Sequence, residues 1–242
     1  MTTEARRQDP RLAAAVAIET ETPVGEVLSL AAGGLAGAAI ATVIATAFIL
    51  DQPMPDDMTK LIWYAIRASG VVAYLLLWLT TIAGLTISGA FLPKWAGVLM
   101  PVHQLADLAL SLALLHAALL LGDRFAGFTP ETIVVPFRAT YEPFWTGLGI
   151  IALYLAAIVF WSVRIRPQIG YDRWRKLQYL AFVVYALALI HGLFAGTDRE
   201  TVPMKAIYAA TGGVVVLATT LRTISLRRKP APAPRQRAPR PG

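Results

Sequence analysis

The chain has 242 residues, of which 56% are hydrophobic and only 15% are charged. A soluble domain usually carries about 25% charged residues, and the apolar residues of this chain come in long blocks, so the composition indicates one polytopic membrane bundle rather than several soluble domains. Cysteine is absent, which excludes disulfides, thiolate metal sites and the C-x-x-C-H attachment of c-type heme.

The two ends of the chain are more polar than its middle. Residues 1–26 contain only the brief apolar run AAAVAI, which is too short for a cleaved signal peptide, so we expect a polar cytoplasmic leader. Residues 223–242 hold much of the net charge of +7 and are rich in proline and arginine. Such a tail directly after an apolar segment is typical of a disordered cytoplasmic end near anionic membrane lipid, so no nucleic-acid partner is predicted.

The segment 27–222 is predicted to be an all-α, polytopic membrane helix bundle with six transmembrane helices. A spanning helix needs about 20 mostly apolar residues. The stretches that meet this requirement are 27–50, 63–91, 98–121, 144–163, 174–195 and 204–222. The second stretch is longer than a bilayer is thick, so it is expected to tilt or to continue beyond the interface.

The distribution of lysine and arginine predicts the orientation of the bundle. The loop after the fourth span, RIRPQIGYDRWRK, is strongly basic, and so is the C-terminal tail, whereas the loop after the first span has one lysine against three aspartates. Because short cytoplasmic loops are enriched in lysine and arginine, both termini are predicted to be cytoplasmic. The protein is then a multi-pass protein of the inner or plasma membrane.

The chain contains three histidines, and all of them lie in the third and fifth predicted spans. With the orientation above, His116 and His191 lie at similar depths near the outer face of the membrane. His103 and Gln178 each precede them by thirteen residues and so share an inner level about 20 Å away, at 1.5 Å per residue.

A matched pair of histidines on two parallel helices predicts a bound heme. Ionisable side chains within a bilayer are costly and usually functional, and bis-histidine ligation of heme b needs one neutral imidazole from each of two helices at equal height. His116 and His191 meet this requirement. The alternatives are a hydrogen-bonded structural histidine, or zinc, which needs three or four ligands.

The inner level is a weaker candidate for a second heme. His103 is a good iron ligand, but the amide of Gln178 is a poor one. In addition, thirteen residues at 100° each leave an offset of about 220° in an ideal helix, so the two levels do not share one helix face unless a bulge, kink or tilt corrects the offset. The residues therefore predict one heme b and leave the second doubtful.

Four segments resemble the ferric-reductase-like transmembrane domain family. They are WYAIRASGVVAYLLLWLTTIAGL, HQLADLALSLALLHAALLLGD, YEPFWTGLGIIALYL and YDRWRKLQYLAFVVYALALIHGLFAGTD, within about residues 60–200. This family is the six-helix cytochrome b module of ferric reductases, NADPH oxidases and the membrane heme subunit of the methionine-sulfoxide reductase system. The resemblance implies stacked b hemes between the third and fifth spans. It places His103, His116 and His191 at three of the four ligand positions and Gln178 at the fourth.

Two charged residues within the predicted spans add to this site. Arg67 lies in the outer third of the second span, where its guanidinium would suit a heme propionate or would reach the lipid interface. Asp107 follows His103 by one helical turn and shares its face, where it would orient an imidazole, join a proton path or pair with an arginine from a loop.

The sequence predicts an electron-transfer subunit that needs a separate electron donor. No G-x-G-x-x-G motif indicates a flavin or nicotinamide fold, so the donor is expected to be a separate flavoprotein or quinol. The acceptor is expected to be an exported reductase, a ferric chelate or quinone. The predicted function is that of an integral-membrane b-type cytochrome, an oxidoreductase component. The alternative is a heme-free membrane assembly partner or small-molecule carrier that keeps the bundle.

Overall fold

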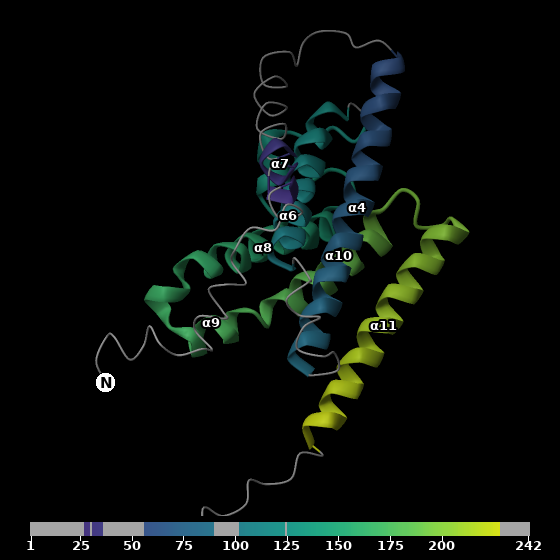
Figure 1. Cartoon of the computed structure of the whole chain (residues 1–242). Helices are drawn as coiled ribbons and strands as arrows, with labels where there is room; N and C mark the ends of the chain where they lie inside the picture. The colour runs from purple at the N-terminus through teal and green to yellow at the C-terminus, as the bar shows by residue number, and fades with distance from the viewer. Residues whose placement is uncertain (1–26, 30, 36–55, 90–101, 124, 228–242) are drawn as a thin grey trace, which may run out of the picture.

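The computed structural model describes residues 27–29, 31–35, 56–89, 102–123 and 125–227, and within these ranges all regular structure is helical. Five long helices form the body of the described chain (Figure 1). They are α4 (Asp56–Gly89), α6 (Val102–Leu119), α8 (Pro143–Ile169), α10 (Leu180–Ala195) and α11 (Val202–Arg227). Shorter elements connect them: the 3-10 turn η1 (Leu120–Gly122), α7 (Pro130–Val134) and α9 (Tyr171–Leu177).

The described chain has five helices that are long and apolar enough to cross a membrane, α9 and α10 being counted together. The prediction of a helical, multi-pass membrane protein is therefore confirmed at this level. Of the first predicted span, 27–50, the structure describes only residues 27–29 and 31–35, which are helical; the leader 1–26 and the tail beyond residue 227 lie outside the described residues.

Helices α4, α8 and α11 continue beyond the expected ends of their spans, and α11 extends to Arg227, so residues 223–227 of the predicted disordered tail are helical. Helix α4 begins at Asp56, seven residues before the predicted start, and its 34 residues extend over about 50 Å at 1.5 Å per residue. Helix α8 continues past residue 163 to Ile169 with Pro167 in its last turns, and it ends at Gly170, whose φ is 83°. A positive φ is readily adopted only by glycine, so Gly170 separates α8 from the basic helix α9.

The fifth predicted span, 174–195, lies within one stretch that is long and apolar enough to cross a membrane, Tyr171–Ala195, but the helix is interrupted inside it. Helix α9 ends at Leu177 and α10 begins at Leu180. Between them, Tyr179 N–H donates to Lys176 O, Ala181 N–H to Gln178 O and Phe182 N–H to Tyr179 O, all at 3.1 Å. These i→i−3 bonds are tighter than those of an α-helix, so they change the rotational phase between Gln178 and His191.

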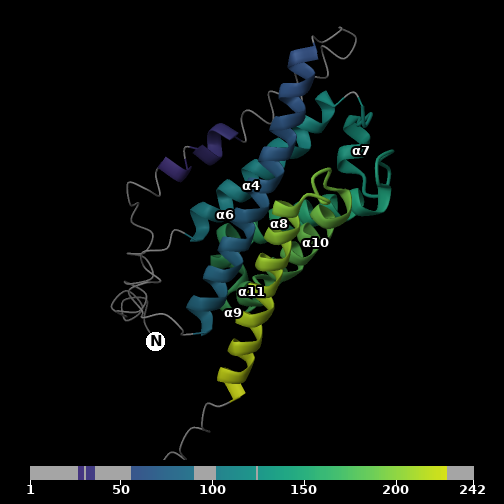
Figure 2. The same cartoon turned by 90° about the vertical axis from the view of Figure 1, so that its right-hand side faces the viewer.

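The long helices pack as two pairs, α4 with α6 and α8 with α10. Helix α11 packs against α4, and both views show it alongside the lower half of α4 (Figures 1 and 2). The α10–α11 turn lies at the same end of the molecule as the loop before α8, because Tyr141 Oη donates to Ala195 O at 3.3 Å and Arg199 pairs with Glu142 at 3.6 Å.

A polar cluster within the apolar core joins α11 to α4 and α10. Tyr74 Oη lies 2.5 Å from Thr211 Oγ1 and 3.3 Å from Tyr185 Oη. Trp78 Nε1 donates to Thr211 O at 3.2 Å, and Tyr208 packs edge-on against Tyr74. Because buried polar groups are costly unless they are paired, this cluster specifies how α11 docks.

Replacing Thr211 by valine is expected to lower the free energy of unfolding by about 1–2 kcal/mol, because it removes the nearer of the two hydroxyl partners of the buried Tyr74 side chain. Thermal unfolding in detergent measures the effect. Thr220→Val is the matched control, since Thr220 is exposed and bonds only to Val216 O of its own helix. Equal melting temperatures for the two variants would contradict the role of Thr211.

Candidate functional site

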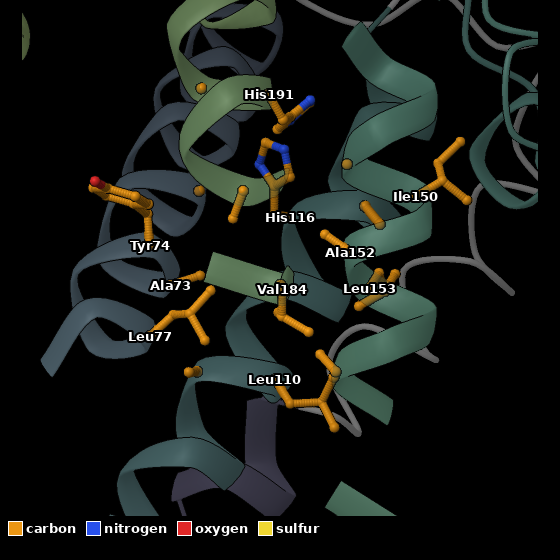
Figure 3. A pocket seen from close by; sticks show the side chains of 18 of the residues that line it. Ala73, Tyr74, Leu77, Leu110, His116, Ile150, Ala152, Leu153, Val184 and His191 are labelled. Atoms are coloured by element: carbon orange, nitrogen blue, oxygen red, sulfur yellow. The ribbon is translucent and has the colours of Figure 1, made fainter. Parts of the chain in front are cut away.

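A cavity of about 1280 Å³ runs between the two helix pairs, and all four residues named at the two predicted levels line it: His103, His116, Gln178 and His191. Ligand sites usually measure about 300–1,000 Å³, so this cavity has room for more than one drug-sized ligand. Most of the other lining residues are apolar, as Figure 3 shows for Leu77, Leu110, Leu153 and Val184.

His116 is held in the cavity by the backbone of α4. Its Nδ1 lies 2.8 Å from Ile66 O. A carbonyl oxygen can only accept a hydrogen bond, so in the neutral imidazole Nδ1 carries the proton and Nε2 is left unprotonated. Neutral imidazole with a bonded Nδ1–H and a bare Nε2 is the form in which histidine binds metals.

His191 is held in the same way by the backbone of α8. Its Nδ1 lies 2.9 Å from Trp145 O, which again places the proton on Nδ1 and leaves Nε2 unprotonated. The two histidines therefore have the same tautomer, although they belong to different helix pairs.

The two imidazoles lie next to one another across the cavity (Figure 3). Their ring centroids are 6.5 Å apart, and their planes are inclined by 75°. A metal ion with an imidazole nitrogen at about 2 Å on each side brings two ring centroids to about 6.4 Å. The separation thus matches that of two axial ligands on one metal ion.

Glycine makes the close approach of each imidazole possible. A Cβ at Gly70 would lie 2.9 Å from His116 Nδ1, and a Cβ at Gly149 would lie 2.7 Å from His191 Nδ1. In both cases the glycine follows, by four residues, the residue whose carbonyl holds the ring. Both histidines are therefore placed in the same way: a backbone carbonyl bonds to Nδ1, and a glycine one helical turn later leaves room for the ring.

The inner level lacks this symmetry. The Gln178 side-chain amide donates to Ser162 Oγ at 3.0 Å, which ties it to α8. His103, Asp107 and Arg164 also line the cavity. The 220° offset expected from an ideal helix does not exclude the inner residues from the cavity, since His103 and Gln178 both line it; the break before α10 changes the phase of Gln178 only.

Arg67 lines the cavity but has a partner that the sequence did not predict. Its guanidinium forms a two-point ion pair with Asp198, from the turn between α10 and α11. The Arg67 Cζ also lies 4.0 Å from the centroid of the Trp63 ring. Asp198 is 131 residues away along the chain, so no local pattern could have revealed the pair.

Comparison of the chain with protein-family models, with curated proteins and with solved structures finds no match. The resemblance to the ferric-reductase-like family therefore stays a prediction from the sequence. Within the part of the chain that the structure describes, no group of three or more histidine, aspartate and glutamate side chains is arranged to hold a metal ion. A heme needs only two protein ligands, and the geometry of His116 and His191 is the relevant test for it.

Proposed function

We propose that this chain is an integral-membrane b-type cytochrome that transfers electrons through a heme held between His116 and His191. The observation that carries the proposal is the paired geometry of these residues. Each imidazole has its Nδ1 on a backbone carbonyl and its ring against a glycine, and the two rings are 6.5 Å apart. A structural histidine needs one hydrogen-bond partner, but it does not need a second histidine at the separation of axial ligands.

Heme b supplies one-electron chemistry between ferric and ferrous iron when it is bound. The protein contributes fixed ligands, an apolar surround and nearby charge, which together set the reduction potential. The carbonyls of Ile66 and Trp145 hold the two rings in place and make them more basic. Electrons come from a separate flavoprotein or from quinol and leave to an exported reductase or a ferric acceptor.

The orientation follows from the charge pattern. With six spans and both termini cytoplasmic, α9 and its arginines lie at the cytoplasmic face, and the histidine pair lies near the outer face. The membrane is then the inner or plasma membrane. Electron transfer from a cytoplasmic donor to this heme would cross most of the bilayer.

The absorption spectrum of the purified protein tests the proposal. We expect a Soret band and, after reduction by dithionite, the α band of b-type heme. A sample that lacks both, even after hemin is added, would support the other candidate function, a heme-free assembly partner or small-molecule carrier. That function is favoured by the size and apolar lining of the cavity.

Gln178→His is expected to raise the bound heme from one to two per chain. The change supplies a second histidine at the inner level, where His103 already lines the cavity. The pyridine-hemochrome ratio measures this. Ser162→Ala removes the partner of Gln178 without adding a ligand, so the ratio should stay at one. A second heme in the unmodified chain would show that Gln178 does not limit the inner level.

A further inference from the structure

The turn between α10 and α11 contributes Thr197 and Asp198 to the lining of the cavity. We call this part of the lining, with Trp63, Arg67 and Tyr141, the histidine end. The turn has an ordered hydrogen-bond pattern: Arg199 N–H donates to Gly196 O at 3.2 Å, and Thr201 N–H donates to Asp198 O at 2.9 Å. Asp198 is therefore held by its own backbone as well as by its side chain.

The side chain of Asp198 fixes the edge of the Arg67 guanidinium. Arg67 Nε donates to Asp198 Oδ2 at 2.5 Å, and Nη2 donates to Oδ1. Both side chains are mostly shielded, with exposed fractions of 28% for Arg67 and 22% for Asp198. Shielding from water lowers the effective dielectric constant, so each of these charges acts more strongly on its surroundings than a surface charge would.

The face of the same guanidinium is fixed by Trp63, at 4.0 Å from Arg67 Cζ to the ring centroid. A guanidinium has five N–H donors. Asp198 engages two of its nitrogens, and the structure records no other hydrogen bond of Arg67 among the described residues. The remaining donors are on a group that lines the cavity.

This ion pair lies one residue along α4 from the backbone contact of a proposed ligand. Arg67 follows Ile66, whose carbonyl holds the His116 ring at 2.8 Å. Any charge left uncompensated at Arg67 or Asp198 would therefore act next to the ring that we propose as an axial ligand. A positive charge near an iron centre favours the reduced state and a negative charge favours the oxidised state.

We propose that Asp198 is a positioning residue that fixes Arg67 at the histidine end of the cavity and offsets its charge, so that the pair sets the reduction potential of the heme. This inference rests on the proposed function. It differs from a propionate contact of Arg67, because it assigns the main partner of the guanidinium to the protein itself.

Redox titration of the heme-loaded full chain, followed by its absorption spectrum, tests the inference. Asp198→Asn keeps the shape but removes the negative charge, so the midpoint potential should rise. Arg67→Gln leaves Asp198 uncompensated, so the potential should fall. We expect each change to shift the reduction equilibrium about tenfold, or about 59 mV for one electron. The midpoint potential of the double variant should lie close to that of the unmodified protein.

Shifts of opposite sign in the midpoint potentials of Asp198→Asn and Arg67→Gln would indicate charge compensation. A purely structural role would shift both potentials in the same direction or leave both unchanged. Arg138→Gln is the matched control, because it breaks the exposed pair between Arg138 and Glu131 and should leave the potential unchanged. Shifts of the same sign would overturn the inference, and so would unchanged potentials. If Asp198→Asn does not retain heme, Arg67→Gln decides: a fall supports the inference and any other result refutes it. An unmodified protein without heme would refute the proposed function as well.

Discussion

Replacing His116 or His191 by alanine is expected to remove most of the bound heme, whereas His103→Ala removes much less. Each of the first two changes deletes one of the two proposed ligands, whose ring centroids lie 6.5 Å apart. The third histidine, His103, precedes His116 by thirteen residues on α6, which is about 20 Å at 1.5 Å per residue, so it cannot take the place of either. The heme content of the purified variants, measured as pyridine hemochrome, gives the result.

His103→Ala is the matched control for the loss of a histidine from the same cavity. His103 lies on α6 with His116. Its predicted counterpart on the other histidine helix is Gln178, whose side-chain amide donates a hydrogen bond to Ser162. Equal loss of heme from all three variants would contradict the ranking of the two levels. Full retention of heme by both His116→Ala and His191→Ala would contradict the site itself.

Gly149→Ala is expected to weaken heme binding about 10–100-fold while the bundle still folds, as is usual when a group that orients a metal ligand is lost. The new Cβ would lie 2.7 Å from Nδ1 and 2.9 Å from Cε1 of His191. The ring must then move away from Trp145 O, and it loses both its hydrogen bond and its alignment with His116. Titration of the heme-free variant with hemin measures the affinity.

Gly213→Ala provides the control for the same chemical change in a helix. A Cβ at Gly213 meets nothing within 4 Å, so heme affinity should be unchanged. The heme affinity of Gly70→Ala should lie between those of Gly149→Ala and Gly213→Ala, because a Cβ at Gly70 would lie 2.9 Å from His116 Nδ1. Equal affinities for Gly149→Ala and Gly213→Ala would show that the glycine does not seat the histidine.

Hydrophobic patterning was sufficient to predict the helical membrane fold. Runs of about 20 apolar residues have few alternatives to a spanning helix, because a lipid environment requires every backbone group to be bonded within the segment. The same pattern was sufficient to predict that His116 and His191 lie at similar depths, because depth follows from the number of residues between each histidine and the end of its helix. The helix ends were less predictable: polar residues continue α4 and α8 beyond the apolar stretches, and the break at Gln178 depends on local hydrogen bonds.

The parts of the site that sequence reasoning missed are contacts between distant segments. Asp198 pairs with Arg67, which is 131 residues away along the chain. Gly149 of α8 lies against the ring of His191 of α10. A glycine within an apolar span is typical of ordinary helix packing, so its role is visible only once the ring is placed against it.

The spin state and amount of heme in the unmodified protein test the central claim most directly. Two neutral imidazoles on one iron give a six-coordinate, low-spin heme, so electron paramagnetic resonance of the oxidised protein should show a low-spin ferric signal. The pyridine-hemochrome assay should give about one heme per chain. A protein that binds no heme, or binds it only in a high-spin form, would contradict ligation by His116 and His191.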